Sequence, residues 1–153
     1  MKIFDCFMFY DENIVLDIRL NQLDEFVDYF VIVESKQFHN GLDRALKFNI
    51  DDYPKFKDKI EYFVIEKEPD GLVEDKKLHL NSFNKRFNSL KRIEQSYEYM
   101  FNGLSDAHEN DLILLSDNDE IPNLKSLFNS NINNDFILFK QLFFYYKFNL
   151  LYD

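Results

Sequence analysis

Cysteine, glycine, proline and tryptophan are scarce in this sequence of 153 residues, which contains one cysteine, three glycines, three prolines and no tryptophan. The lone Cys6 excludes an intrachain disulfide and fits a reducing compartment. So few glycines and prolines exclude a flexible linker or a repeat built from turns. These scarcities point away from disulfide scaffolds and linkers.

Long uncharged hydrophobic runs are also missing. No stretch approaches the roughly 20 apolar residues that a membrane-spanning helix needs. Asp5, Asp11 and Glu12 interrupt the start of the chain, where a signal peptide would be apolar. We therefore expect a cytoplasmic protein without a transmembrane segment. The net charge of −10 argues against nonspecific nucleic-acid binding, and it means that an anionic ligand needs a local cation.

Aromatic residues are abundant, with 18 Phe and 9 Tyr, and apolar residues make up 46% of the chain. This composition can supply the core of one domain over residues 1–153. Apolar runs predict strands over residues 2–9, 29–35, 59–68 and 111–115, with one or two more within 135–153. Helical spacing predicts a helix behind an N-cap at Asp11, another over 82–104 and a short one over 121–128. This alternation predicts an α/β fold with a mostly parallel sheet, whose ligands bind beyond the carboxyl ends of the strands.

The segment LILLSDNDEIP, Leu112–Pro122, ends a predicted strand with adjacent carboxylates. In an extended chain, Asp117 and Asp119 would point to one side and Asn118 to the other. Carboxylate oxygens select hard cations such as Mg²⁺, Mn²⁺ or Ca²⁺. An EF-hand loop is excluded, because Pro122 and Phe128 stand where that loop needs Gly and Glu.

Three interpretations of this acidic turn remain open from these residues alone. The Asp-x-Asp pair can hold a metal-bound diphosphate, as in nucleotide-sugar glycosyltransferases. Asp117 can instead be the nucleophile of a phosphohydrolase of the haloacid-dehalogenase type. The third interpretation is a solvated turn that caps the following helix, in a chain that keeps the fold as an inactive interaction module.

Three sequence blocks resemble glycosyltransferase family 17, the family of the β-1,4-mannosyl-glycoprotein 4-β-N-acetylglucosaminyltransferases. The first is FDCFMFYDENIVLDIRLNQLDEFVDYFVIVESKQFHNG, Phe4–Gly41. LILLSDNDEIP is similar to the family's DIVLISDVDEIP, and FFYYKFNL, residues 143–150, is similar to its aromatic strand with FYYNLN. The blocks occur in the family's order and together extend over most of the chain. Relatives continue well beyond the aromatic strand, so we expect residues 1–153 to be the donor-binding portion, with the C-terminal part absent.

The resemblance implies a GT-A-like fold and a transfer that inverts the anomeric configuration. The sugar, N-acetylglucosamine in the family, would pass from a UDP-sugar donor to a glycan acceptor. A Mn²⁺ or Mg²⁺ cofactor would be held by Asp117 and Asp119. The candidate site residues are Asp119 and Glu120 as catalytic residues, and Asp5, Arg19, Glu34, Arg44 and Asp117 as cofactor-binding residues.

Several of these residues also have a structural interpretation. A salt bridge of Arg19 with Asp5 or Glu34 explains these charges as readily as a phosphate contact does. We expect His39, in a polar loop, to be exposed. Cys6 is expected to be a small buried hydrophobic residue.

Overall fold

The computed structural model describes residues 1–73, 82–129, 136–144 and 151. The chain divides into two units, Met1–Asp119 and Glu120–Asp153, which are considered separately below.

A sheet of four parallel strands forms the centre of the first unit. The strands are β1 (Ile3–Met8), β2 (Tyr29–Ser35), β3 (Ile60–Ile65) and β4 (Leu112–Leu115), in the order β3-β2-β1-β4. Phe4 is the register partner of Tyr29 in β2 and of Ile113 in β4. This order is the first part of the Rossmann arrangement. The prediction of an α/β fold with a parallel sheet is therefore confirmed.

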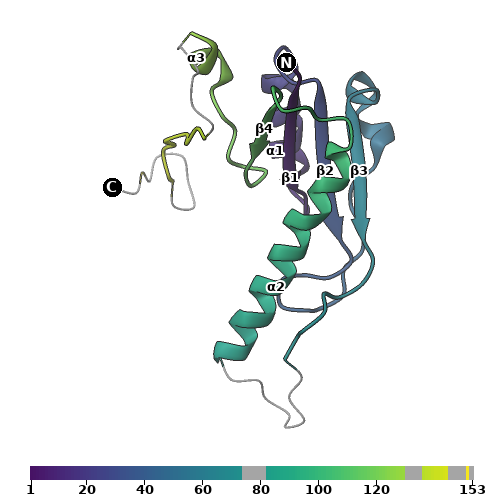
Figure 1. Cartoon of the computed structure of the whole chain (residues 1–153). Helices are drawn as coiled ribbons and strands as arrows, with labels where there is room; N and C mark the ends of the chain where they lie inside the picture. The colour runs from purple at the N-terminus through teal and green to yellow at the C-terminus, as the bar shows by residue number, and fades with distance from the viewer. Residues whose placement is uncertain (74–81, 130–135, 145–150, 152–153) are drawn as a thin grey trace. The chain divides into compact units, whose positions relative to one another are not determined.

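Helices cover both faces of this sheet. Helix α1 (Asn13–Leu23) packs on one face, and α2 (Ser82–Met100), which continues as a 3₁₀ turn at Phe101–Leu104, packs on the other. Figure 1 shows α2 lying across its face and extending past the carboxyl ends of β2 and β3. Two short 3₁₀ helices, Ile50–Asp52 and Pro54–Phe56, precede β3.

Every residue of β1 is buried, because the strand is central and covered on both faces. Phe4, Cys6 and Met8 belong to the core cluster under α2, together with Met100. The alternate positions face α1, where the guanidinium of Arg19 lies 4.5 Å from the centre of the Phe7 ring. The period-two alternation of a strand explains this division, and double coverage explains why β1 reads as a continuous apolar run.

Most predicted element ends differ from the structure by one to three residues, and two of these differences have a visible reason. Helix α1 begins at Asn13, so Glu12 rather than Asp11 occupies the N-cap position, without a side-chain capping bond. The third strand ends at Ile65, because the chain turns away into the polar residues that follow. Among the described helices, none combines the length and apolar character needed to cross a bilayer.

The second unit contains the short helix α3 (Leu124–Phe128), which the sequence predicted. Asn123 begins it, and its side-chain oxygen accepts a hydrogen bond from the Ser126 N–H. Within the predicted strand region 135–153, residues 136–144 form no strand, and one antiparallel bridge joins Phe144 to Leu151. The rest of that region lies outside the described residues.

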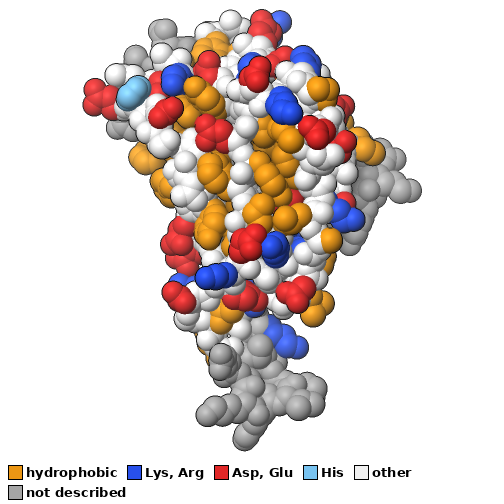
Figure 2. Space-filling view, turned by 90° about the vertical axis from the view of Figure 1, so that its right-hand side faces the viewer, with side chains coloured by type: hydrophobic (Ala, Val, Ile, Leu, Met, Phe, Trp, Pro, Cys, Tyr) orange, Lys and Arg blue, Asp and Glu red, His pale blue; other side chains and the backbone are white. Residues whose placement is uncertain are grey.

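Charge of both signs is spread over the β3 side of the molecule. Figure 2 shows hydrophobic side chains in the middle of this face, with acidic and basic residues around them. Among the described residues on this face, charges of both signs therefore alternate without a large patch of one sign.

Candidate functional site

A cavity of about 290 Å³ lies at the carboxyl ends of β1 and β4. The chain leaves β1 toward β2 on one side, while β4 pairs with β1 on the other, so the strand order reverses here. Ligands of open parallel sheets bind at such a switch point. The lining residues are Met8, Tyr10, Glu12, Val15, His39, Asp117, Asn118 and Asp119.

The guanidinium of Arg19 is hydrogen-bonded to the acidic turn. It also forms a two-pronged ion pair with Asp5, with nitrogen–oxygen distances of 2.7 and 2.8 Å. The same group donates to the carbonyl oxygens of Asp117 and Asn118, at 2.8 and 3.1 Å, and to the hydroxyl of Ser116 at 2.7 Å. Arg19 and Asp5 are both fully buried. Through these hydrogen bonds, Arg19 connects helix α1 to strand β1 and to the turn after β4.

A second buried pair holds the loop after β2. Arg44 pairs with Glu34 at 2.9 Å and donates to the carbonyl oxygens of Ser35 and Tyr10. The Glu34 carboxylate also accepts hydrogen bonds from the backbone N–H groups of Lys47 and Phe48. The Tyr62 hydroxyl donates to it as well, at 2.8 Å. Burial and this hydrogen bond raise the pKa of Tyr62. The charges therefore compensate each other inside the protein.

The cofactor-binding role predicted for Asp5, Arg19, Glu34 and Arg44 stays a prediction, and the structure shows these four residues paired with each other beside the cavity. None of the four lines the cavity, and their side chains are at most 4% exposed. For Arg19 the salt bridge with Asp5 is the interpretation that the structure supports. A fully buried charge needs an internal partner, and these residues supply partners to each other.

Asp117 and Asp119 both line the cavity and are exposed. The expectation that Asn118 turns away is wrong, because Asn118 lines the same cavity and is only 5% exposed. The reason is local: residues 118 and 119 form a turn, so the side-to-side alternation of an extended chain does not apply. Both polar atoms of the Asn118 side chain are buried without a hydrogen-bond partner among the described residues.

The oxygen chemistry of this turn fits a hard cation. Asp117, Asp119 and Glu12 surround the cavity with carboxylates. In the part of the chain that is described, no group of three or more His, Cys, Asp or Glu side chains is arranged to hold a metal ion. Two aspartates would supply only part of the ligands that a hard cation takes, and a bound anion and water would supply the rest.

His39 was expected to be exposed, but it is half-buried at the cavity wall. Its ring meets Tyr10 edge-on, with 4.9 Å between ring centres, and its Nε2 is buried without a partner among the described residues. Burial lowers the pKa of His39, and the Asp117 charge opposes this in part. Burial also raises the pKa of Tyr10 to about 12, so its phenol stays protonated. The cavity thus combines acidic side chains with neutral polar ones.

Glu120, the other predicted catalytic residue, is the first residue of the second unit. Its catalytic role stays a prediction. Sequence reasoning gave no role to His39 and Asn118, which the structure brings to the cavity. The only sequence signal was the place of Asn118 between two candidate ligands.

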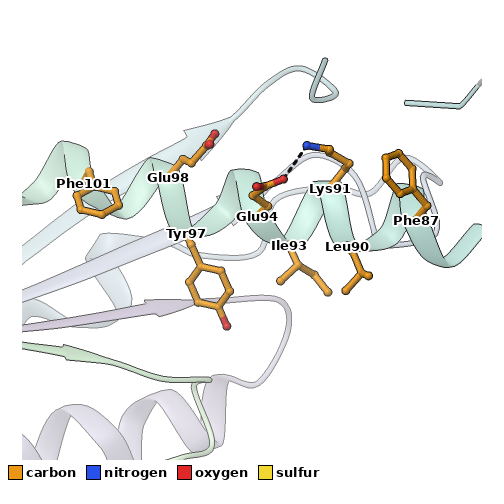
Figure 3. A pocket seen from close by; sticks show the side chains of 8 residues that line it. All are labelled: Phe87, Leu90, Lys91, Ile93, Glu94, Tyr97, Glu98 and Phe101. Carbon is orange, nitrogen blue, oxygen red and sulfur yellow. Dashed lines mark hydrogen bonds and ion pairs between the residues drawn. The ribbon is translucent and has the colours of Figure 1, made fainter. Parts of the chain in front are cut away.

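A second, more open depression lies along α2. Figure 3 shows that its lining side chains come from one helix and the turn after it, with Lys91 and Glu94 forming an ion pair at 2.8 Å. Tyr97, Ile93 and Leu90 lie on one side of the helix in this view. Polar groups from different elements do not converge here, so this surface lacks the arrangement expected of a reaction site.

Comparison with known proteins gives one match. A family model described as Glycosyltransferase family 17 matches residues 1–149, a range that includes every residue lining the cavity. No curated protein and no solved structure matches the chain.

Proposed function

The chain belongs to glycosyltransferase family 17, and from this premise we propose that it transfers N-acetylglucosamine from a UDP-sugar donor to a glycan acceptor. The observation that carries the proposal is the cavity at the switch point of the sheet, lined by both aspartates of the acidic turn. The family match supports glycosyl transfer over the phosphohydrolase interpretation of Asp117.

The charges of the cavity support a metal-dependent form of this reaction. Its acidic side chains, Glu12, Asp117 and Asp119, would repel a nucleotide diphosphate. In the proposal, Asp117 and Asp119 would hold Mn²⁺ or Mg²⁺, which would supply positive charge to neutralise a diphosphate. Arg19 fixes the backbone that presents both carboxylates, so the site is organised before the ligand arrives.

The proposed reaction is a direct displacement. An acceptor hydroxyl oxygen forms a bond to the anomeric carbon, and the bond from that carbon to the diphosphate oxygen breaks with inversion. The electron pair leaves with UDP, and the hydroxyl proton passes to a base. Glu120, next to Asp119 in the chain, is the predicted base.

A thermal-shift series tests this function. UDP-N-acetylglucosamine at 100 times its Kd, with Mn²⁺ present, should stabilise the fold by about 2.7 kcal/mol. For a protein of this size the melting temperature then rises by roughly 5–11 °C. The shift should disappear with EDTA and in Asp119→Asn.

Asp58→Asn is the matched control, because Asp58 is an exposed aspartate just before β3, at the opposite end of the sheet from the cavity. This variant should keep the full shift. A wild-type protein that melts at the same temperature with and without UDP-N-acetylglucosamine and Mn²⁺ contradicts the proposed function. Release of phosphate from small phosphomonoesters would favour the phosphohydrolase instead.

A further inference from the structure

We propose that His39 and Asn118 are specificity-determining residues that hydrogen-bond the hydroxyl groups of a sugar ring of the donor, an inference that rests on the proposed function. Both line the cavity that holds Asp117 and Asp119. Each has side-chain polar atoms that are buried without a partner among the described residues. Buried polar groups in folded proteins are almost always hydrogen-bonded, so two exceptions at one cavity point to a ligand that completes them.

Asn118 carries the stronger of the two observations. The residue is only 5% exposed, and neither its amide nitrogen nor its amide oxygen has a partner in the described parts of the chain. An apolar residue at this place would avoid the cost of burying an unpaired amide. The amide offers both a donor and an acceptor, which is the combination that a sugar hydroxyl uses.

His39 is presented by a loop that is held firmly. Its carbonyl oxygen accepts a hydrogen bond from Arg92 at 3.1 Å, and Arg92 is itself paired with Glu68 at 2.7 and 2.8 Å. Gly41 has a positive φ of 85°, and a Cβ there would come within 2.5 Å of the Arg92 guanidinium. The left-handed backbone at this position favours glycine, and the bond from Arg92 fixes the backbone that carries the imidazole.

The charge state of this pair matches a neutral ligand group rather than a phosphate. The groups around the His39 ring are Tyr10, Asp117 and Arg92, with Glu12 on the same cavity. Burial lowers the pKa of His39, so the ring is neutral at neutral pH and Nε2 can serve one hydrogen bond. A neutral imidazole and an amide can hydrogen-bond hydroxyl groups. The diphosphate would instead be bound through the cation that the aspartates hold.

The size of the cavity agrees with a single ring. Pockets for complete small-molecule ligands span roughly 300–1,000 Å³, and this cavity holds about 290 Å³. This volume is at the lower end of that range and has room for one ring of a sugar nucleotide. Two rings adjoin its diphosphate, the transferred sugar and the ribose, and both carry hydroxyl groups.

Calorimetry on four variants separates these possibilities, with UDP and UDP-N-acetylglucosamine as probes in the presence of Mn²⁺. Asn118→Leu and His39→Phe remove the polar atoms and keep similar volumes. Each should weaken binding of UDP-N-acetylglucosamine about tenfold or more, since a site built to bond a hydroxyl loses most when its bonds are lost. His39→Gln restores a polar group near the place of Nε2 and should recover part of the affinity.

Gln37→Leu is the matched control. Gln37 also has a buried side-chain oxygen without a partner among the described residues, but it does not line the cavity. This variant should bind both probes as the wild type does. Without ligand, Asn118→Leu should melt at or above the wild-type temperature, because it removes an unpaired buried amide.

The two probes identify the ring. Weaker binding of UDP-N-acetylglucosamine alone assigns the pair to the transferred sugar, and equal weakening for UDP assigns it to the ribose. Asn118→Leu and His39→Phe proteins that bind both probes with wild-type affinity overturn this inference and leave the proposed function standing. A wild-type protein that binds neither probe with Mn²⁺ overturns both.

Discussion

Removing the Arg19 side chain should destabilise the fold and disorganise the acidic turn, and these two effects can be separated. Arg19→Met leaves Asp5 fully buried without its partner, at a position where the two charges were 2.7 Å apart. Leaving one member of a buried ion pair uncompensated costs about 3–5 kcal/mol. For a protein of this size the melting temperature then falls by roughly 6–20 °C.

The double variant Asp5→Leu/Arg19→Met isolates the second effect. It removes both charges, so most of the electrostatic cost disappears, and apolar replacement of a buried pair is often neutral or stabilising. The carbonyl oxygens of Asp117 and Asn118 nevertheless lose their donor, as does the Ser116 hydroxyl. We expect the double variant to recover much of its stability and to remain weak in Mn²⁺-dependent UDP binding.

Urea unfolding of both variants, followed by circular dichroism, gives the stabilities, and calorimetry gives the UDP affinities. Lys57→Met is the control, because the pair of Lys57 with Asp51 is exposed and should change stability by less than about 1 kcal/mol. Arg19→Met with wild-type stability refutes the reasoning about the buried pair. A double variant with wild-type UDP affinity refutes the role of Arg19 in holding the turn.

Three further predictions follow from single residues. Burial raises the pKa of the Cys6 thiol to about 12, so the native protein should not react with Ellman's reagent at pH 8 until it is unfolded; rapid reaction of the native state contradicts this. Burial lowers the pKa of His39 from 6.5, so the unfolded chain takes up the proton first and stability falls as the pH drops below 6.5; His39→Gln should flatten this part of the profile, and an unchanged slope contradicts the assignment. A Cβ at Gly103 would lie 2.6 Å from both methyl groups of Val31, so Gly103→Ala should cost about 1–3 kcal/mol in urea unfolding, and wild-type stability contradicts the packing described here.

The sheet was predictable because its strands are covered on both faces. A strand such as Tyr29–Ser35 then appears as a continuous apolar run between polar segments, and its ends were predicted correctly. The place of the acidic turn followed as well, since the carboxyl ends of parallel strands meet at one edge of the sheet. The pairing of Asp5 with Arg19 was one of two interpretations that the sequence allowed.

The contacts that position the cavity residues could not be predicted in the same way. Arg19 lies 98 positions before Asp117 in the chain, and their contact depends on how α1 packs against the sheet. His39 reaches the cavity because Arg92 in α2 holds its loop, 53 positions away. Asn118 faces the cavity because of a turn that the alternation of an extended strand does not describe. Local sequence patterns contain neither of the two long-range contacts, from Arg19 and from Arg92.

The most direct test of the account is calorimetric titration of UDP into the wild-type protein with and without Mn²⁺, beside Asp117→Asn and Asp119→Asn. UDP binding should require Mn²⁺ in the wild type and should be lost or strongly weakened in both variants. UDP binding that is the same without the metal, or that both variants retain at full affinity, would contradict the claim that these two aspartates hold a cation for the diphosphate.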